Sequence, residues 1–270
     1  MYINNIINFL IFTYNGEYSI YLYDIRSIST DLGGYMIFAA IVAGGIGTRL
    51  GSDIPKQFLM LGSKPIIVHT VEKFLLCSKF DAIFVGVHEN WIPYAQDIFK
   101  KYNLDDKVFF SVGGKDRNLT IMNIISDIES KFGDSSDHII VTHDAVRPFV
   151  SLRIIEDNIS AAKSDGACDT VVKSNDTIIE SDHDVTEIRS VPNRKYMFLG
   201  QTPQSFRMSD LKELFNKLDE SQKNELTDAC KIFVLNNRPV KLVMGEFSNL
   251  KITTMSDYKI AQSLLEINFD

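Results

Sequence analysis

The stretch that decides the fold is Ile37-Phe38-Ala39-Ala40-Ile41-Val42-Ala43-Gly44-Gly45-Ile46-Gly47-Thr48-Arg49-Leu50-Gly51, which runs on to Pro55-Lys56-Gln57-Phe58. It begins as an apolar strand and turns into a glycine-rich loop that presents Arg49 and Lys56. Glycine has no Cβ, so the backbone N–H groups of such a loop can approach a phosphate closely. Arg49 and Lys56 can then bind the negatively charged phosphate. The stretch therefore predicts a strand followed by a phosphate-binding loop.

Two better-known phosphate-binding loops are excluded. A Walker A loop needs a Gly-Lys-Ser/Thr triplet, and the chain has none. In a dinucleotide-binding loop the helix begins directly on the glycines, whereas Pro55 follows here and would break such a helix. An ordinary strand-to-helix turn remains an alternative for the loop taken by itself.

The composition indicates a globular protein with one large domain, with or without an appendage. The chain has 270 residues, of which 45% are hydrophobic and 23% charged, and a formal net charge of -7. This acidic balance disfavours general nucleic-acid binding. The three cysteines lie far apart without a C-x-x-C motif, so we expect a reduced, cytoplasmic compartment. The five histidines form no H-x-x-x-H or H-x-H pair, which leaves a zinc site without support.

Residues 1–35 differ in character from the rest of the chain. They are rich in Tyr, Ile and Asn, and their apolar run is too short for a membrane helix and lacks the flanks of a secretory signal. Met36 stands directly before the organising strand. Our hypothesis is that Met36 is the functional start, that 1–35 is an extension outside the fold, and that 36–270 is the functional domain. Mass spectrometry of the native protein tests this, because an abundant peptide from 1–35 would contradict it.

After the loop, strand and helix patterns alternate four times. The expected strands are 82–87, 107–112 and 138–142, and the expected helices are 65–76, 91–102, 118–132 and 154–163. Such alternation predicts an α/β fold, with a mostly parallel, Rossmann-like sheet covered by helices on both faces in three layers. Later we expect helices at about 208–219 and 227–236, a strand at 240–244 and a closing helix to about residue 265.

The pattern breaks at about 167–200. Three short, more polar segments, 170–173, 176–179 and 185–188, resemble strands separated by turn-forming residues. We expect a projecting β-arm at about 171–198. An arm with so little burial of its own usually packs on something else, often a second subunit.

Charged residues and glycines gather where the expected strands end, which is where ligands bind in a parallel α/β sheet. Asp144 is a single carboxylate among several cations, a combination that fits a Mg²⁺-bound triphosphate. Each residue also has a structural alternative: Asp144 could cap a turn, and Arg147 could form a structural ion pair. His143 is better interpreted as a packing or hydrogen-bonded residue than as a base, because phosphoryl transfer to an ionised phosphate needs no base.

Six motifs in order resemble the IspD/TarI cytidylyltransferase family over about 36–266. They are Ala43-Gly44-Gly45-x-Gly47-x-Arg49 with Pro55-Lys56-Gln57-Phe58; Gly113-Gly114 with Arg117; His143-Asp144-Ala145-Val146-Arg147-Pro148; Gln201-Thr202-Pro203-Gln204-Ser205-Phe206; Thr227-Asp228-Ala229-Cys230; and Asn249-Leu250-Lys251-Ile252-Thr253. Their form is closer to the ribitol-5-phosphate branch than to the 2-C-methyl-erythritol-4-phosphate branch.

The resemblance implies that CTP and D-ribitol 5-phosphate react to give CDP-ribitol, a precursor of teichoic acids and capsules, and pyrophosphate. It implies Mg²⁺ as cofactor and a homodimer formed through the arm. The implied catalytic residues are Arg49, Lys56 and Lys251. The implied nucleotide-binding residues are Ala43, Gly44, Gly45, Gly47, Gly114, Arg117, Thr120, Asp144 and Ala145, with Asp144 also the metal ligand. The implied acceptor-binding residues are Thr177, Arg194 and Thr202, the first two reaching the neighbouring subunit's site.

One departure from the family and two alternatives stay open. Relatives often have an aspartate just before the Asn-x-Lys triplet as a second metal ligand, but Phe247 and Ser248 stand there and Glu246 is the nearest acid. The first alternative is the methyl-erythritol phosphate enzyme of isoprenoid synthesis, with the same chemistry. The second is a non-catalytic nucleotide-binding regulator, which the full set of Arg49, Lys56, Asp144 and Lys251 disfavours.

Overall fold

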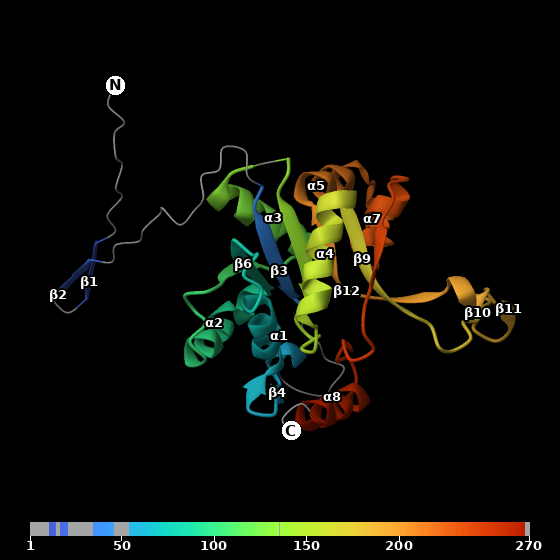
Figure 1. Cartoon of the computed structure of the whole chain (residues 1–270), viewed down its shortest axis with the longest axis horizontal. Helices are drawn as coiled ribbons and strands as arrows, with labels where there is room; N and C mark the ends of the chain where they lie inside the picture. Colours follow the sequence, from blue (N-terminus) through green and yellow to red (C-terminus); the bar gives the residue numbers. More distant parts are fainter. Residues whose placement is uncertain (1–10, 15–16, 21–34, 46–53, 135, 268–270) are drawn as a thin grey trace. The chain divides into compact units, whose positions relative to one another are not determined.

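The computed structural model describes residues 11–14, 17–20, 35–45, 54–134 and 136–267. The chain divides into two compact units, Met1–Gly34 and Tyr35–Asp270. In the first unit, β1 (Ile11–Tyr14) and β2 (Glu17–Ile20) form an antiparallel hairpin. That residues 1–35 lie outside the functional protein stays a prediction. The second unit holds every other element (Figure 1).

A seven-stranded sheet forms the centre of the second unit, in the order β13-β9-β12-β8-β3-β6-β7. Its strands are β3 (Ile37–Ala43), β6 (Ala82–Val87), β7 (Phe109–Val112), β8 (Ile139–Asp144), β9 (Ala167–Lys173), β12 (Phe198–Arg207) and β13 (Lys241–Met244). All neighbouring pairs are parallel except those of β12, which is antiparallel to both β8 and β9. The prediction of a mostly parallel sheet is confirmed.

Two hydrophobic cores cover the two faces of the sheet, because alternate residues of each strand point to opposite sides. On β3, Ile37, Ala39 and Ile41 belong to one core, and Phe38 and Ala40 to the other. Helices α1 (Ile66–Leu75), α2 (Ile92–Lys101) and α4 (Leu152–Asp165) cover the first face, and α3 (Arg117–Phe132), α5 (Met208–Lys217) and α7 (Cys230–Leu235) the second. The predicted three-layer arrangement is thereby confirmed.

Further elements connect or flank these layers. They are the 3-10 turns η3 (Lys56–Phe58), η4 (Glu89–Trp91) and η5 (Arg194–Tyr196), the strands β4 (Met60–Leu61) and β5 (Lys64–Pro65), and the helices α6 (Glu220–Asn224) and α8 (Met255–Ile267). Among the described residues, no helix combines the length and apolar character needed to cross a bilayer.

Strand β12 was not predicted. Its sequence is mixed in polarity and contains Pro203, which argues against a central strand because proline cannot donate to the ladder. The strand nevertheless lies between β8 and β9, pairing Gln204 with both Thr142 and Asp169. An irregularity between Gly200 and Gln204 in its pairing with β9 accommodates the proline.

The arm is shorter than predicted. Residues 171–173 belong to β9, which is largely buried in the central sheet, so their assignment to the arm is wrong. The arm begins at Ser174 and returns before β12, with β10 (Glu180–Ser181) and β11 (Ile188–Ser190) as its paired strands. No strand forms at 176–179, although those residues are described. Figure 1 shows this hairpin extending away from the sheet beside β9 and β12.

Candidate active site

A cavity of about 220 Å³ opens where β3 and β8 end. Ten residues predicted to act in catalysis or nucleotide binding line it: Ala43, Gly44, Gly45, Lys56, Gly114, Arg117, Thr120, Asp144, Ala145 and Lys251. The predicted Gly47 and Arg49 lie outside the described residues. The structure therefore brings together side chains from widely separated parts of the sequence, at the edge of the sheet where they were expected.

The loop after β3 is held by Gln57, whose amide is buried behind it. Gln57 Nε2 donates to the carbonyl oxygen of Ala43 at 2.7 Å and to that of Gly45 at 3.0 Å. Because Gln57 belongs to the same 3-10 turn as Lys56, these bonds tie the lysine to the glycine loop. Sequence reasoning gave Gln57 no role. The available signal was an amide placed directly before the apolar Phe58 and Leu59.

A second loop, between β7 and α3, closes over the cavity around Thr120. Thr120 Oγ1 accepts the N–H of Gly114 at 3.0 Å and donates to the carbonyl of Asp116 at 2.8 Å. A Cβ at Gly114 would lie 2.5 Å from Leu119 Cβ and 2.9 Å from Thr120 N, so only glycine fits there. Gly44 faces the same threonine, and a Cβ on it would lie 3.0 Å from Thr120 Oγ1. Thr120 thus sets the spacing of the two glycine loops.

Asp144 is surrounded by cations at the base of the cavity. Its Oδ1 accepts from Arg117 Nε at 3.0 Å, and its Oδ2 lies 2.8 Å from Lys251 Nζ and 3.9 Å from Arg147 Nε. Burial by itself would raise the pKa of Asp144, but the charges of Arg117 and Lys251 outweigh burial and hold that pKa far below its usual value. The carboxylate therefore stays ionised at any physiological pH.

Arg117 has donor capacity that the protein does not use. Its Nη1 and Nη2 atoms are buried and have no hydrogen-bond partner among the described residues. Buried guanidinium nitrogens without partners are costly, and a ligand that supplies oxygen atoms removes that cost. Arg117 also lines the cavity, where its positive charge favours an anionic ligand.

A buried chain of hydrogen bonds fixes the base of the site. Asp144 N donates to Thr202 Oγ1 at 3.1 Å, and the Thr202 hydroxyl lies 3.0 Å from His143 Nδ1. The other ring nitrogen, His143 Nε2, lies 3.1 Å from the carbonyl oxygen of Arg147. A carbonyl can only accept, so Nε2 carries the proton and Nδ1 accepts from Thr202.

His143 is consequently not a catalytic base. Burial lowers the pKa of His143 to about 3, so the imidazole is neutral at physiological pH. Both of its nitrogens have protein partners, and it does not line the cavity. The interpretation of His143 as a hydrogen-bonded residue is confirmed.

Arg147 and Asn249 hold the segment that carries Lys251. Arg147 is 7% exposed and its Nη1 donates to the carbonyl of Asn249 at 2.8 Å. Asn249 Nδ2 donates in turn to the carbonyl of Thr202 at 2.8 Å. Arg147 therefore has the structural role that was left open as an alternative, and it links Asp144 to the Lys251 segment.

Two carboxylate residues of the described chain line this cavity, and Asp144 is the one that could hold a metal ion, because Asp116 Oδ1 accepts from Leu119 N at the start of α3. Glu246 lies elsewhere: its Oε1 accepts from Ser151 Oγ and from Arg153 Nη2, each at 2.9 Å. Within the described ranges, no three His, Cys, Asp or Glu side chains converge on one point. This donor set suits Mg²⁺, which is often held by one or two carboxylates and completes its shell with water and substrate phosphates.

The predicted acceptor-binding residues lie apart from this cavity. Thr177 and Arg194 are on the arm, where Arg194 Nη1 donates to the carbonyl of Asn175 at 3.0 Å. Thr202 lies beneath Asp144 and does not line the cavity. One chain thus assembles the cavity at the ends of β3 and β8, and its arm residues remain outside it.

Comparisons with known proteins agree with this arrangement. Residues 37–267 match a family model described as IspD, 2-C-methyl-D-erythritol 4-phosphate cytidylyltransferase. The chain is 49% identical over 234 residues to the ribitol-5-phosphate cytidylyltransferase of Streptococcus pneumoniae serotype 2, covering 86% of this chain and 99% of that protein.

Solved structures give the same fold. The 4-diphosphocytidyl-2C-methyl-D-erythritol synthase of Anaerococcus prevotii is 28% identical, with a TM-score of 0.72, over 86% of this chain and 99% of its own. The 2-C-methyl-D-erythritol 4-phosphate cytidylyltransferase of Francisella tularensis is 27% identical, with a TM-score of 0.70, over 84% of this chain and 99% of its own. Both solved structures are thus matched over nearly their whole length.

Proposed function

The chain belongs to the IspD family of cytidylyltransferases, and from that premise we propose that it transfers CMP from CTP to D-ribitol 5-phosphate, giving CDP-ribitol and pyrophosphate. The observation that carries the choice of acceptor is the 49% identity to a ribitol-5-phosphate cytidylyltransferase over nearly its full length. Identity to the solved methyl-erythritol phosphate enzymes is lower, at 28% and 27%. A product of this kind would supply ribitol-phosphate polymers such as teichoic acids, and we place the reaction in the cytoplasm.

In the proposed mechanism a phosphate oxygen of the acceptor attacks the α-phosphorus of CTP in line. The new P–O bond forms as the bond to the pyrophosphate breaks, and negative charge grows on the α-phosphoryl oxygens and the leaving group. Lys56 and Lys251 line the cavity from opposite parts of the chain and supply positive charge to these groups, together with Arg49. The acceptor phosphate is already ionised, so no residue has to remove a proton.

Asp144 would hold Mg²⁺, whose charge would neutralise the phosphates of bound CTP. The ammonium of Lys251 lies 2.8 Å from Asp144 Oδ2. When a triphosphate enters, Lys251 can exchange this carboxylate for a phosphate oxygen, which keeps its charge paired throughout. Arg117 retains its own contact to Asp144, and its positive charge adds to the attraction of the cavity for the phosphates of the nucleotide.

The arm would complete the acceptor half of the site in a homodimer. Its support is the exposure of large apolar side chains there: Ile188 is 64% exposed and Val191 56% exposed, which is typical of a surface covered by a partner. Thr177 and Arg194 would then bind the acceptor phosphate at the neighbouring chain's cavity.

Pyrophosphate release tests the substrate. The protein is supplied with CTP and Mg²⁺, and with ribitol 5-phosphate or methyl-erythritol phosphate in parallel reactions. We expect faster release with ribitol 5-phosphate. The matching family model is described as a methyl-erythritol phosphate enzyme. If the protein preferred that substrate, it would replace ribitol 5-phosphate as the proposed acceptor. Activity with neither would favour a nucleotide-binding regulator.

Subunit mixing tests the composite site. Lys56→Ala and Arg194→Ala are each expected to be inactive as homodimers. Exchange of subunits between them should restore activity, because a mixed dimer has one site with Lys56 from one chain and Arg194 from the other. Failure of the mixture to recover, with exchange verified by a mass tag, would contradict a site shared between chains.

A further inference from the structure

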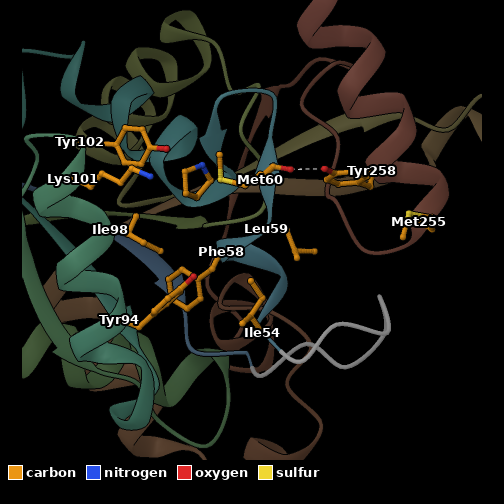
Figure 2. Close-up of a pocket in the computed structure, with 11 residues that line it drawn as sticks. Ile54, Phe58, Leu59, Met60, Tyr94, Ile98, Lys101, Tyr102, Met255 and Tyr258 are labelled. Atoms are coloured by element: carbon orange, nitrogen blue, oxygen red, sulfur yellow. Dashed lines mark hydrogen bonds between the residues drawn. The ribbon is translucent and has the colours of Figure 1, made fainter.

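A second cavity, of about 550 Å³, lies on the α1–α2 side of the sheet, between α2, the segment from η3 to β4, and α8. It has no lining residue in common with the nucleotide cavity. Figure 2 shows Ile98 and Lys101 of α2 facing Leu59 and Met60 across it, with Met255 and Tyr258 at the α8 end. Its volume lies within the range of about 300–1,000 Å³ that holds small-molecule ligands.

The walls of this cavity are apolar and unusually exposed. Met60 is 46% exposed, Tyr94 40% and Met255 52%, although all three are large hydrophobic side chains. The tyrosine hydroxyls are already partnered at two positions, since Tyr102 donates to the carbonyl of Ser63 and Tyr258 to that of Met60. What these rings offer a ligand is therefore apolar surface, and an apolar body fits it.

Lys101 adds a single positive charge to this apolar lining. It is the one charged residue among those that line the cavity, and no carboxylate of the described chain forms an ion pair with it. Its ammonium lies 5.8 Å from the centre of the Tyr102 ring, at the edge of the apolar walls. An anionic group at one end of an apolar ligand would complete this arrangement.

We propose that the cavity binds a small, freely diffusing amphipathic anion, an apolar ring or chain that carries one carboxylate, sulfonate or phosphate. The proposal does not depend on the transferase reaction. It does place the ligand against Phe58, which belongs to the same 3-10 turn as Lys56.

The test uses the fluorescent probe 8-anilinonaphthalene-1-sulfonate, an aromatic body with one sulfonate, and the whole chain. Trp91 is the sole tryptophan of the sequence, and its ring lies 5.8 Å from that of Phe58 and 5.6 Å from that of Tyr94. We expect saturable probe binding accompanied by quenching of Trp91 emission. Lys101→Gln should weaken binding about three- to tenfold, the effect of a partly exposed ion pair.

Matched variants separate this site from general apolar binding. Lys100→Gln changes an exposed lysine of the same helix that does not line the cavity, and should leave affinity unchanged. The neutral analogue N-phenyl-1-naphthylamine should bind Lys101→Gln as well as the unaltered chain. Met60→Asp places a carboxylate in the apolar wall and should strongly weaken binding of the anionic probe, whereas Val234→Asp, on the exposed side of α7, should not. Binding that is unaffected by Lys101→Gln and Met60→Asp, or that leaves Trp91 emission unchanged, would overturn the proposal.

Discussion

Replacement of Lys251 by methionine separates catalysis from stability in this site. The substitution keeps an unbranched apolar stem, with sulfur in place of Cδ, and removes the ammonium that lies 2.8 Å from Asp144 Oδ2. Asp144 itself is almost fully buried, with 9% of its side chain exposed, so the loss of a cation there could be expected to destabilise the fold. Whether it does depends on the cations that remain.

The geometry predicts a small effect on folding and a large one on turnover. Arg117 Nε stays 3.0 Å from Asp144 Oδ1 and Arg147 stays nearby, so the carboxylate is not left unpaired. Lys251 is 42% exposed, and a pair with such an exposed partner contributes about 1 kcal/mol or less. A cation directed at the charge that develops in a transition state contributes far more, about 10²- to 10³-fold in kcat.

The assay compares urea unfolding with pyrophosphate release from CTP and ribitol 5-phosphate. Lys251→Met should lose activity about 10²- to 10³-fold while its unfolding free energy changes by about 1 kcal/mol or less. Lys259→Met, which removes an exposed lysine of α8 outside the cavity, is the matched control and should match the unaltered chain in both measurements. A loss of stability large enough to account for the lost activity would refute a catalytic role for Lys251.

Three further outcomes are expected. Gly114→Ala should lower the melting temperature much more than Gly45→Ala, because the new Cβ would lie 2.5 Å from Leu119 Cβ in the first case and meets nothing within 4 Å in the second; equal shifts in thermal denaturation would contradict this. Burial raises the pKa of Asp169 to about 6, so the folded state binds a proton that the unfolded state has released, and stability should fall as pH rises from about 4 to 6. Asp169→Asn should reduce this fall in the free energy of unfolding, measured by urea unfolding at several pH values. If the pH dependence is unchanged, groups other than Asp169 cause it. Removal of divalent ions with EDTA should abolish pyrophosphate release without lowering the melting temperature, because Asp144 is already paired with Lys251 and Arg117; activity that survives chelation would remove the metal from the mechanism.

The parallel half of the sheet could be predicted because its local sequence and its packing agree. The central strands β6 and β8 are buried throughout, and their neighbouring helices carry the apolar spacing that covers them. β12 lacked such a signal, since most of its buried residues are polar, and Gln204 forms hydrogen bonds with Thr142 of β8 and Asp169 of β9 across the sheet. Residues 198–207 form a strand because they pair with β8 and β9, and their local sequence shows no strand pattern that would predict it.

For the active site, the sequence identified most of the residues that line the cavity and left out those that position them, including Gln57, which also lines it. Lys56, Asp144 and Lys251 follow expected strands or stand in recognisable motifs. Gln57 and Asn249 donate hydrogen bonds to backbone carbonyls of residues that are not their neighbours in the sequence. Such partners come together only in the folded chain, so the sequence alone does not identify them. The arm boundary was misplaced for a related reason: the polar residues near Lys173 resemble an arm until the pairing of Lys173 with Phe198 is known.

The place of β12 in the sheet also governs when the site can exist during folding. The strand lies between β8 and β9, yet it follows both in the chain, and Gln204 pairs with residues 62 positions earlier, at Thr142, and 35 earlier, at Asp169. Contacts at such separation carry a loop-closure cost and form slowly. Thr202 reaches Asp144 only when this strand has been inserted, so a chain with its earlier strands and helices in place still lacks the hydrogen bond from Asp144 N to Thr202 Oγ1. The complete set of contacts around Asp144 is therefore found only in molecules that have completed the sheet.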